Sequence, residues 1–175
     1  MKYFVPEVIQ TSAMDCGPAS LKSLFEGFGV PVNYSRLREA CQTDIDGTSI
    51  DSLEIIAGNL GLDVEQIMLP ADFLLLPDAH CLPAIIVVSL PQNIPHFIVV
   101  WKIHKNFIQI MDPAVGRRWV NRQQFLDSLY LHDMRLPAAD WREWACSDLF
   151  CNCVRFRLTR AGVSQEQARA YILKA

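Results

Sequence analysis

The feature that most constrains the fold is a pair of apolar segments separated by a very short linker. "HFIVVWKI" (96–103) and "FIQIMD" (107–112) are rich in β-branched and aromatic residues, and only "HKN" lies between them. Two such runs so close together predict an antiparallel β-hairpin. "LPAIIVVSL" (82–90) precedes the pair, and "RRWVN" (117–121) follows it after the turn "PAVG". We therefore expect an antiparallel sheet in the second half of the chain.

Two further segments also have strand patterns. The nearly continuous apolar run at residues 82–90 predicts a central strand that is covered on both faces. The alternation of polar and apolar residues in "GLDVEQIMLP" (61–70) predicts another strand. The pattern of "RQQFLDSLYL" (122–131), in contrast, predicts a helix after the last strand.

The first half of the chain has helical patterns. One helix is expected to begin at Cys16 or at the next residue, with Asp15 as its N-cap and Gly29 just beyond its end. Two shorter helical patterns follow Ser35 and Ser49. Helices that precede an antiparallel sheet are typical of the α+β class.

The composition is that of a soluble globular protein. Of 175 residues, 51% are hydrophobic and 20% are charged, which excludes a disordered chain. The longest apolar run is too short to span a bilayer, and the N-terminus has no secretion signal. We therefore expect the six cysteines to be free thiols in the cytosol. The net charge of −3 gives no reason to expect a nucleic-acid partner.

Cys16, in "MDCGPAS", is the candidate nucleophile. The N–H groups and the dipole of a helix N-terminus favour a thiolate, which is the nucleophilic form of cysteine. Taken alone, Cys16 would more often be a buried structural residue, so the hypothesis needs a histidine partner. His96 lies where a loop meets a strand and is the best candidate. We expect His80, His104 and His132 to lie in loops or at the hairpin turn.

Asp112 ends the strand that follows the His96 strand, and it can orient the imidazole as the aspartate of a catalytic triad does. The two side chains share a face of the sheet only if Ile98 lies opposite Asp112. That register requires an odd-length loop, such as residues 104–106, or a bulge. We predict one of these, because a regular two-residue turn at 105–106 would place the pair on opposite faces.

Acyl transfer also requires donors for the oxyanion that forms in the tetrahedral intermediate. The backbone N–H of Cys16 is one candidate donor. The side-chain amide of Gln10, six residues upstream on the incoming loop, is the other. The candidate set is therefore Cys16 as nucleophile, His96 as base, Asp112 as orienting group and Gln10 as oxyanion donor.

These residues lie in segments that resemble the papain-like cysteine peptidases, in particular the bacteriocin-processing peptidase domain of peptide cleavage and export ABC transporters. The matching segments are "VIQTSAMDCGPASL", "DGTSI", "LPAIIVV", "HFIVVWKI" and "IMDPAVGRRWV", which together span about residues 5–130. The resemblance implies a papain-like α+β fold, with an N-terminal helical part packed on the antiparallel sheet. It also implies the same four roles for Cys16, His96, Asp112 and Gln10.

The resemblance further implies the substrate and the partners. A precursor peptide would be cleaved after a Gly-Gly pair in its leader and then exported. Transmembrane and ATP-binding domains would belong to the same polypeptide, with the peptidase on the cytoplasmic side of the membrane. No cofactor is expected in this domain. The sequence has no Walker-type loop, so ATP would bind only to a nucleotide-binding domain elsewhere.

Two domains are expected, a peptidase domain over residues 1–130 and a helical extension or linker over residues 131–175. The second segment departs from the family and has no assigned function. Its three cysteines, Cys146, Cys151 and Cys153, lack the paired spacing of a zinc site and have no histidine partner. We therefore disfavour a metal site there.

Two other functions remain open at this stage. The same triad would serve another thiol acyl transfer, of the transglutaminase or amidase type, on the same fold. Alternatively, the chain would be a non-catalytic module that docks export substrates. Replacement of Cys16 by alanine separates an enzyme from a docking module.

Overall fold

The computed structural model describes residues 2–45, 47–70, 73–76, 80–131, 137–160 and 162–172. The chain divides into two compact units, residues 1–131 and residues 132–175. His132, which we expected in a polar loop, lies outside the described residues.

Three helices open the first unit: α1 (Cys16–Phe28), α2 (Tyr34–Ala40) and α3 (Ile50–Asn59). All three were predicted, and α2 begins one residue earlier than expected. α1 ends at Gly29, whose φ of 86° is readily adopted only by glycine. The side chains of Asn33 and Ser49 accept hydrogen bonds from first-turn N–H groups of α2 and α3, which fixes where these helices start.

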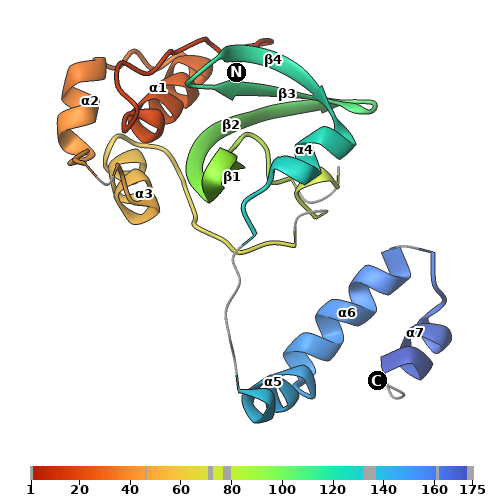
Figure 1. The fold of residues 1–175 in the computed structure, drawn as a ribbon. Coiled ribbons are helices and arrows are strands. Elements are labelled where there is room, and N and C mark those ends of the chain that lie inside the picture. The colour runs from red at the N-terminus through yellow and green to blue at the C-terminus, as the bar shows by residue number, and fades with distance from the viewer. Residues whose placement is uncertain are drawn as a thin grey trace. The chain divides into compact units, whose positions relative to one another are not determined.

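Four strands follow and form one antiparallel sheet in the order β1-β2-β3-β4 (Figure 1). Their bounds are β1 (Ala84–Leu90), β2 (Ile94–His104), β3 (Phe107–Asp112) and β4 (Gly116–Asn121). Short 3₁₀ helices, η1 (Phe73–Leu75) and η3 (Pro91–Asn93), precede β1 and β2. Helix α4 (Arg122–Ser128) begins directly after β4 with a capping box formed by Asn121 and Gln124. The prediction of the α+β class is confirmed.

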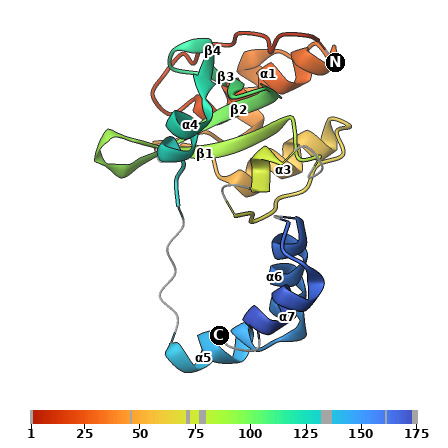
Figure 2. The ribbon, with the colours of Figure 1, turned by 90° about the vertical axis from the view of Figure 1, so that its right-hand side faces the viewer.

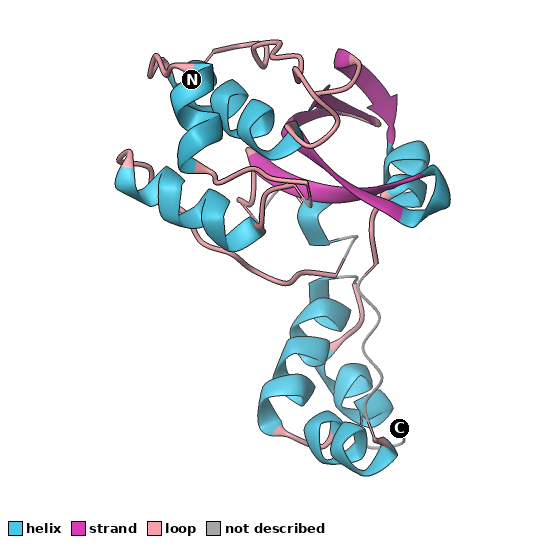
Figure 3. Ribbon diagram, turned by 60° about the vertical axis from the view of Figure 1, so that its left-hand side comes forward, coloured by secondary structure: helices cyan, strands magenta, loops and turns pink. Residues whose placement is uncertain are grey.

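Helices cover both faces of the sheet (Figures 2 and 3). One face packs against α1, through a cluster that contains Leu24, Val99, Trp101 and Met111. The opposite face packs against η1 and α4, through a cluster that contains Leu75, Ile98, Val100, Ile110 and Phe125. A third cluster joins α1, α2 and α3 through Leu21, Phe25, Leu37 and Leu53. The sheet is thereby held as a rigid layer between the helix that begins at Cys16 and the helix that follows β4.

β1 lies at the edge of the sheet, so the expectation of a central strand at residues 82–90 is wrong. Its apolar side chains do contact both faces, since Ile85 packs with the α1 side and Ile86 with the α4 side. Its outer edge is partly covered after α4, where the Tyr130 N–H donates to the Val87 carbonyl at 3.1 Å. A continuous apolar run thus indicates that both faces of a strand are covered, but it does not indicate whether the strand has one neighbour in the sheet or two.

The strand expected at residues 61–70 is also absent. This segment has no strand partner, and Ile67 and Met68 are 50% and 80% exposed. The Gln66 N–H donates instead to the Glu54 carboxylate of α3 at 3.0 Å. A segment with alternating polarity forms a strand only when a neighbouring strand is available to pair with it. Here the segment is hydrogen-bonded to a helix instead.

The described residues of the second unit form three helices, α5 (Ala138–Ala145), α6 (Asp148–Arg160) and α7 (Gln165–Ile172), which agrees with its helical sequence pattern. Trp141, Trp144 and Phe150 form an aromatic cluster with ring centroids 4.5–6.2 Å apart. Within the described residues of the whole chain, no helix combines the length and the apolar character that a membrane span requires.

Candidate active site

Cys16 is the first residue of α1 and is 9% exposed. Burial raises the pKa of its thiol, but several interactions lower this pKa by more. The largest is a hydrogen bond with His96, followed by backbone N–H groups of Phe97 and Gly17 and by the positive charge of the imidazolium. The net effect is a pKa below the ordinary value of 9.0. The structure therefore favours a thiolate at this position.

Gly17 permits a close approach of another segment to the start of α1. A Cβ atom at this position would lie 3.0 Å from the Thr48 Cβ and 3.3 Å from its hydroxyl. Thr48 belongs to the "DGTSI" segment that precedes α3. Thr48 therefore packs directly against the start of α1, and a Cβ atom at position 17 would require it to shift.

His96 and Asp112 lie in direct contact, with 2.8 Å between His96 Nε2 and Asp112 Oδ1. Both are almost fully buried, at 3% and 4% exposure. Burial lowers the pKa of His96, but the hydrogen bonds and charges of Asp112 and Cys16 raise it to about 9. The imidazole is therefore protonated at neutral pH. Since Nε2 faces Asp112, Nδ1 is the ring nitrogen left for the thiol.

The turn between β2 and β3 contains only two residues, 105–106, because His104 pairs with Phe107. The odd-length loop that we offered as one way to set the register is therefore wrong. A two-residue turn on its own would place His96 and Asp112 on opposite faces of the sheet, because side chains alternate along a strand.

A β-bulge at Trp101 restores the required register, and this second expected possibility is confirmed. The pairs on either side of the bulge are Lys102 with Gln109 and Val100 with Ile110. One extra residue in β2 thus changes the pairing from even-with-odd to even-with-even. Extending the register past the pair Val99 and Met111 places Ile98 opposite Asp112.

Asp112 has two more hydrogen-bond partners besides His96. The Ala114 N–H donates to its Oδ1 at 3.0 Å, and Arg118 Nη2 donates to its Oδ2 at 2.9 Å. Burial raises the pKa of this carboxyl, but His96, Ala114 and Arg118 together hold it below its usual value. Asp112 is therefore an ionised carboxylate in a fixed orientation.

Sequence analysis missed Arg118. The segment "MDPAVGRRWV" did contain a signal for this contact. A tight turn pairs Asp112 with Gly116, and Arg118, two residues after Gly116, then lies on the same face of the sheet as the Asp112 carboxylate. The basic character of "RR" gave no hint of which arginine would face Asp112. In the structure Arg117 instead donates to the Val5 carbonyl at 3.0 Å.

Gln10 lies beside the turn that follows Asp112, where its backbone N–H donates to the Pro113 carbonyl at 2.9 Å. Its side chain is half-buried, and its Oε1 is buried without a hydrogen-bond partner among the described residues. The N-terminal segment is thus anchored next to the end of β3. The role of Gln10 as oxyanion donor stays a prediction.

Asp15 occupies the N-cap position of α1, but its side chain makes no capping hydrogen bond. The expectation that its carboxylate caps the helix is therefore wrong. Asp15 is fully buried, and its two oxygens accept hydrogen bonds from Thr11 Oγ1 at 2.6 Å and from Arg38 Nε at 2.7 Å. These partners outcompete the helix N–H groups because one of them is a cation, and hydrogen bonds between charged groups are the stronger ones.

The remaining candidates lie outside this site. His80 and His104 are exposed. None of the six cysteines, all of which lie in the described part of the chain, forms a disulfide, and the Cys151 thiol donates to the Ala145 carbonyl at 3.6 Å. Within the part of the chain that the structure describes, no three His, Cys, Asp or Glu side chains gather to hold a metal ion.

Crystal structures of two peptidase domains resemble the chain. One is a double-glycine motif protease from an AMS/PCAT transporter in complex with the leader peptide, with a TM-score of 0.64 and 26% identity over 71% of this chain and 85% of that one. The other is the peptidase domain of Streptococcus ComA, a bi-functional ABC transporter involved in a quorum sensing pathway, with a TM-score of 0.64 and 26% identity over 71% and 91%. These similarities confirm the predicted papain-like architecture.

Curated relatives include the lactococcin-G-processing and transport ATP-binding protein LagD of Lactococcus lactis subsp. lactis, 31% identical over 110 residues, or 63% of this chain and 16% of the relative. The pediocin PA-1 transport/processing ATP-binding protein PedD of Pediococcus acidilactici is 29% identical over 126 residues, or 71% and 17%. The chain thus spans 16–17% of the length of these relatives. Residues 5–130 match the model of the peptidase C39 family. The chain belongs to the peptidase C39 family, as the resemblance in its sequence predicts.

Proposed function

We propose that the chain is a cysteine endopeptidase that cleaves leader peptides after a Gly-Gly pair from bacteriocin-type precursors. The observation that carries the proposal is the buried His96 imidazole, which contacts Asp112 at 2.8 Å and lowers the pKa of the Cys16 thiol. Relatives named as bacteriocin processing and transport proteins support this substrate class, as does a similar structure of a double-glycine motif protease with a leader peptide.

In the first half of the reaction the Cys16 thiolate attacks the carbonyl carbon of the second glycine. The resulting oxyanion is held by the backbone N–H of Cys16 and by the Gln10 amide. The imidazolium of His96 then donates its proton to the leaving amine, and the C–N bond breaks. The leader remains attached to Cys16 as a thioester, and the mature peptide leaves with a free N-terminus.

In the second half, water hydrolyses the thioester. Neutral His96 accepts a proton from the water, whose oxygen attacks the same carbonyl carbon. The C–S bond breaks, the leader leaves with a new carboxylate, and the thiolate–imidazolium pair is restored. Asp112 keeps Nδ1 of the imidazole directed at the sulfur through both halves. The reaction consumes one water molecule and requires no cofactor.

The names of the curated relatives combine processing with transport in those proteins. We infer that the chain acts with transmembrane and ATP-binding domains of the same polypeptide, on the cytoplasmic side of the membrane, and that ATP serves those domains alone. The curated relatives, several times longer than this chain and named transport ATP-binding proteins, support this arrangement. In this scheme the peptidase releases the peptide where the transporter accepts it.

Cleavage of a synthetic precursor tests the proposal. A peptide with a Gly-Gly leader is incubated with the protein in water enriched in ¹⁸O, and the products are identified by mass spectrometry. We expect one cut after the second glycine, with one ¹⁸O atom in the leader carboxylate. Cys16→Ala should abolish the cut, whereas Cys146→Ala, which removes an exposed thiol from the second unit, should not change it.

Other outcomes favour the rival functions. Cleavage that persists in Cys16→Ala contradicts the proposal. Transfer of the leader to an added amine, with little ¹⁸O in the product, favours a transglutaminase-type acyl transfer. Binding of the precursor without cleavage by the wild-type protein favours a docking module.

A further inference from the structure

The loop between the two predicted oxyanion donors is held by a buried carboxylate. Asp15 is 0% exposed, and each of its oxygens has its own donor, Thr11 Oγ1 at 2.6 Å and Arg38 Nε at 2.7 Å. Thr11 directly follows Gln10, and Asp15 directly precedes Cys16. The network therefore joins the two ends of the short loop that separates Gln10 from Cys16.

The charge of Asp15 is matched by one cation. Burial raises the pKa of this carboxyl, but the side-chain hydrogen bonds from Thr11, Arg38 and Ser12 and the charge of Arg38 hold it below its usual value. A buried carboxylate without its partner is strongly unfavourable, so the pair holds the loop only as long as both members are present. Arg38 comes from α2, a different element, which ties the loop to the helical part of the fold.

The Gln10 side chain is half-buried. Its amide oxygen is buried without a partner among the described residues, so no hydrogen bond to that oxygen sets the direction of the amide. The backbone is fixed on one side, by the hydrogen bond from its N–H to the Pro113 carbonyl. On the other side the first anchored residue is Thr11, through Asp15. The segment that carries the amide is thus anchored at Pro113 on one side and through Asp15 on the other.

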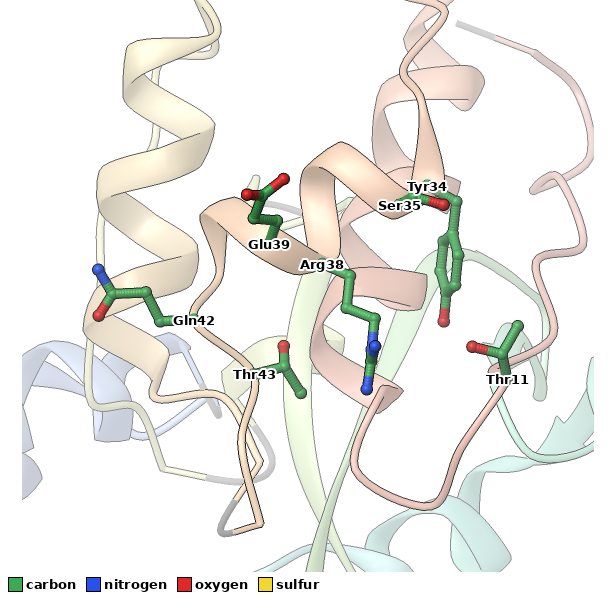
Figure 4. A pocket seen from close by; sticks show the side chains of 7 residues that line it. All are labelled: Thr11, Tyr34, Ser35, Arg38, Glu39, Gln42 and Thr43. Atoms are coloured by element: carbon green, nitrogen blue, oxygen red, sulfur yellow. The ribbon is translucent and has the colours of Figure 1, made fainter.

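Arg38 reaches this network along the wall of a pocket that is open to solvent. Figure 4 shows Arg38 and Tyr34 extending from α2 toward Thr11, with Gln42 and Thr43 beyond Arg38. The pocket has a volume of about 400 Å³, and the Arg38 side chain is 48% exposed. A small cation added to the solvent can therefore reach the position of the guanidinium when the side chain is shortened.

We propose that Asp15, held by Thr11 and Arg38, is a positioning residue that fixes the Gln10 amide relative to the Cys16 thiol. This inference rests on the proposed peptidase function, because it concerns the oxyanion donor of that reaction. A displacement of one ångström in such a group is enough to cost about 100-fold in rate. The network therefore acts on the chemical step and leaves the binding of the leader unaffected.

Arg38→Ala tests the proposal, with Arg36→Ala as the matched control. Arg36 lies on the same helix and is exposed. In Arg38→Ala we expect kcat for precursor cleavage to fall about 10- to 100-fold with KM changed less than about twofold. Guanidinium ion at low millimolar concentration should restore part of the lost rate in Arg38→Ala and should not accelerate wild type or Arg36→Ala.

Two readouts separate positioning from loss of structure. Alkylation of Cys16 by iodoacetamide forms no oxyanion, so its rate should be nearly the same in wild type and Arg38→Ala. In a Gln10→Ala background, Arg38→Ala should cost little further activity, because the group that it positions is already absent. Thr11→Val, on the exposed loop, removes the hydrogen bond from Thr11 to Asp15 and should give the same pattern if Arg38→Ala does not fold.

Three results would overturn the inference: Arg38→Ala as active as Arg36→Ala, an equal loss in the Gln10→Ala background, or a parallel loss of Cys16 alkylation. In each case the wild-type protein still cleaves and Cys16→Ala does not, so the proposed function survives. Absence of cleavage by the wild-type protein overturns the proposed function itself.

Discussion

Cys16 and His96 hold each other in their charged forms. The thiol pKa lies below 9.0, and the imidazole pKa is raised to about 9 because Asp112 and the thiolate both favour the imidazolium. The two groups titrate as a coupled pair, so the ion pair persists between the two apparent values. In the proposed mechanism the nucleophile is therefore ready before substrate binds, and the proton that the leaving amine needs is already on His96.

This pairing predicts a bell-shaped pH dependence of kcat/KM for precursor cleavage. Activity should rise as the Cys16 thiol loses its proton at a pH below its ordinary value, and fall as His96 loses its proton near pH 9. In Asp112→Asn the alkaline limb should move to lower pH, because the carboxylate that raises the His96 pKa is gone. An alkaline limb at about 6.5 in the wild-type protein, the ordinary value for histidine, would contradict this account.

Arg118 should make a smaller contribution. It donates to Asp112 at 2.9 Å, but its side chain is 49% exposed and Asp112 keeps its contacts with His96 and Ala114. Solvent screening limits such a contact to about 1 kcal/mol. Arg118→Met should therefore lower kcat/KM roughly fivefold, and Arg118→Lys should retain part of that difference. Steady-state kinetics of both variants at pH 7 measures this, and a loss as large as that of Asp112→Asn would be too great for a supporting contact.

At this scale the sequence indicated the residues to which we assign the proposed chemistry, but it did not indicate the residues that hold them in place. Cys16, His96 and Asp112 each stand at the start or end of an element, and such ends can be located from a pattern. Arg38 and Arg118 act through side chains that reach across to another element. Their partners depend on packing between elements, which no local pattern contains.

At the scale of elements, the bulge at Trp101 decides whether His96 faces Asp112. The pattern of the hairpin predicted two strands. It could not predict the bulge, because a strand that is buried on both faces has no alternation of polar and apolar residues that an extra residue would interrupt. The same burial concealed that β1 is an edge strand. The extended segment at 61–70 shows the converse error, since its alternation was read without a partner strand.

Trp101, the residue at the bulge, packs against Gly27 of α1, and this contact gives a prediction. A Cβ atom at Gly27 would come closer than 3.0 Å to the buried indole ring. Gly27→Ala should therefore destabilise the fold by about 1–3 kcal/mol through overpacking. The control is Gly58→Ala in α3, where a Cβ atom meets nothing within 4 Å and should be neutral or stabilising by up to about 1 kcal/mol. Urea unfolding measures both, and equal stabilities would contradict the contact.

At the scale of the whole chain, every candidate site residue belongs to the first compact unit, residues 1–131. This unit also contains the three apolar clusters that hold the sheet. The expected domain boundary at residues 130–131 stays a prediction. The sequence indicated where the resemblance to the family ends and a helical segment begins. A helical pattern alone, however, does not indicate the function of the second unit.

Truncation tests that boundary. Residues 1–131 expressed alone should unfold cooperatively and should cleave the precursor with kcat/KM within about twofold of the full chain, because no group of the proposed mechanism is removed. Thermal unfolding followed by circular dichroism and cleavage kinetics measure this. A truncated protein that is folded but inactive would show that residues 132–175 contribute to the reaction.

The pH dependence of Cys16 alkylation tests the central claim most directly. Iodoacetamide labels the protein over a range of pH, and mass spectrometry of the peptide that contains Cys16 gives the rate at that thiol alone. We predict an apparent pKa below 9.0 in the wild-type protein and a clear increase in His96→Ala, where the imidazolium is absent and burial remains. A Cys16 pKa that is already ordinary in the wild-type protein, or that does not change in His96→Ala, would contradict the claim that the hairpin activates this cysteine.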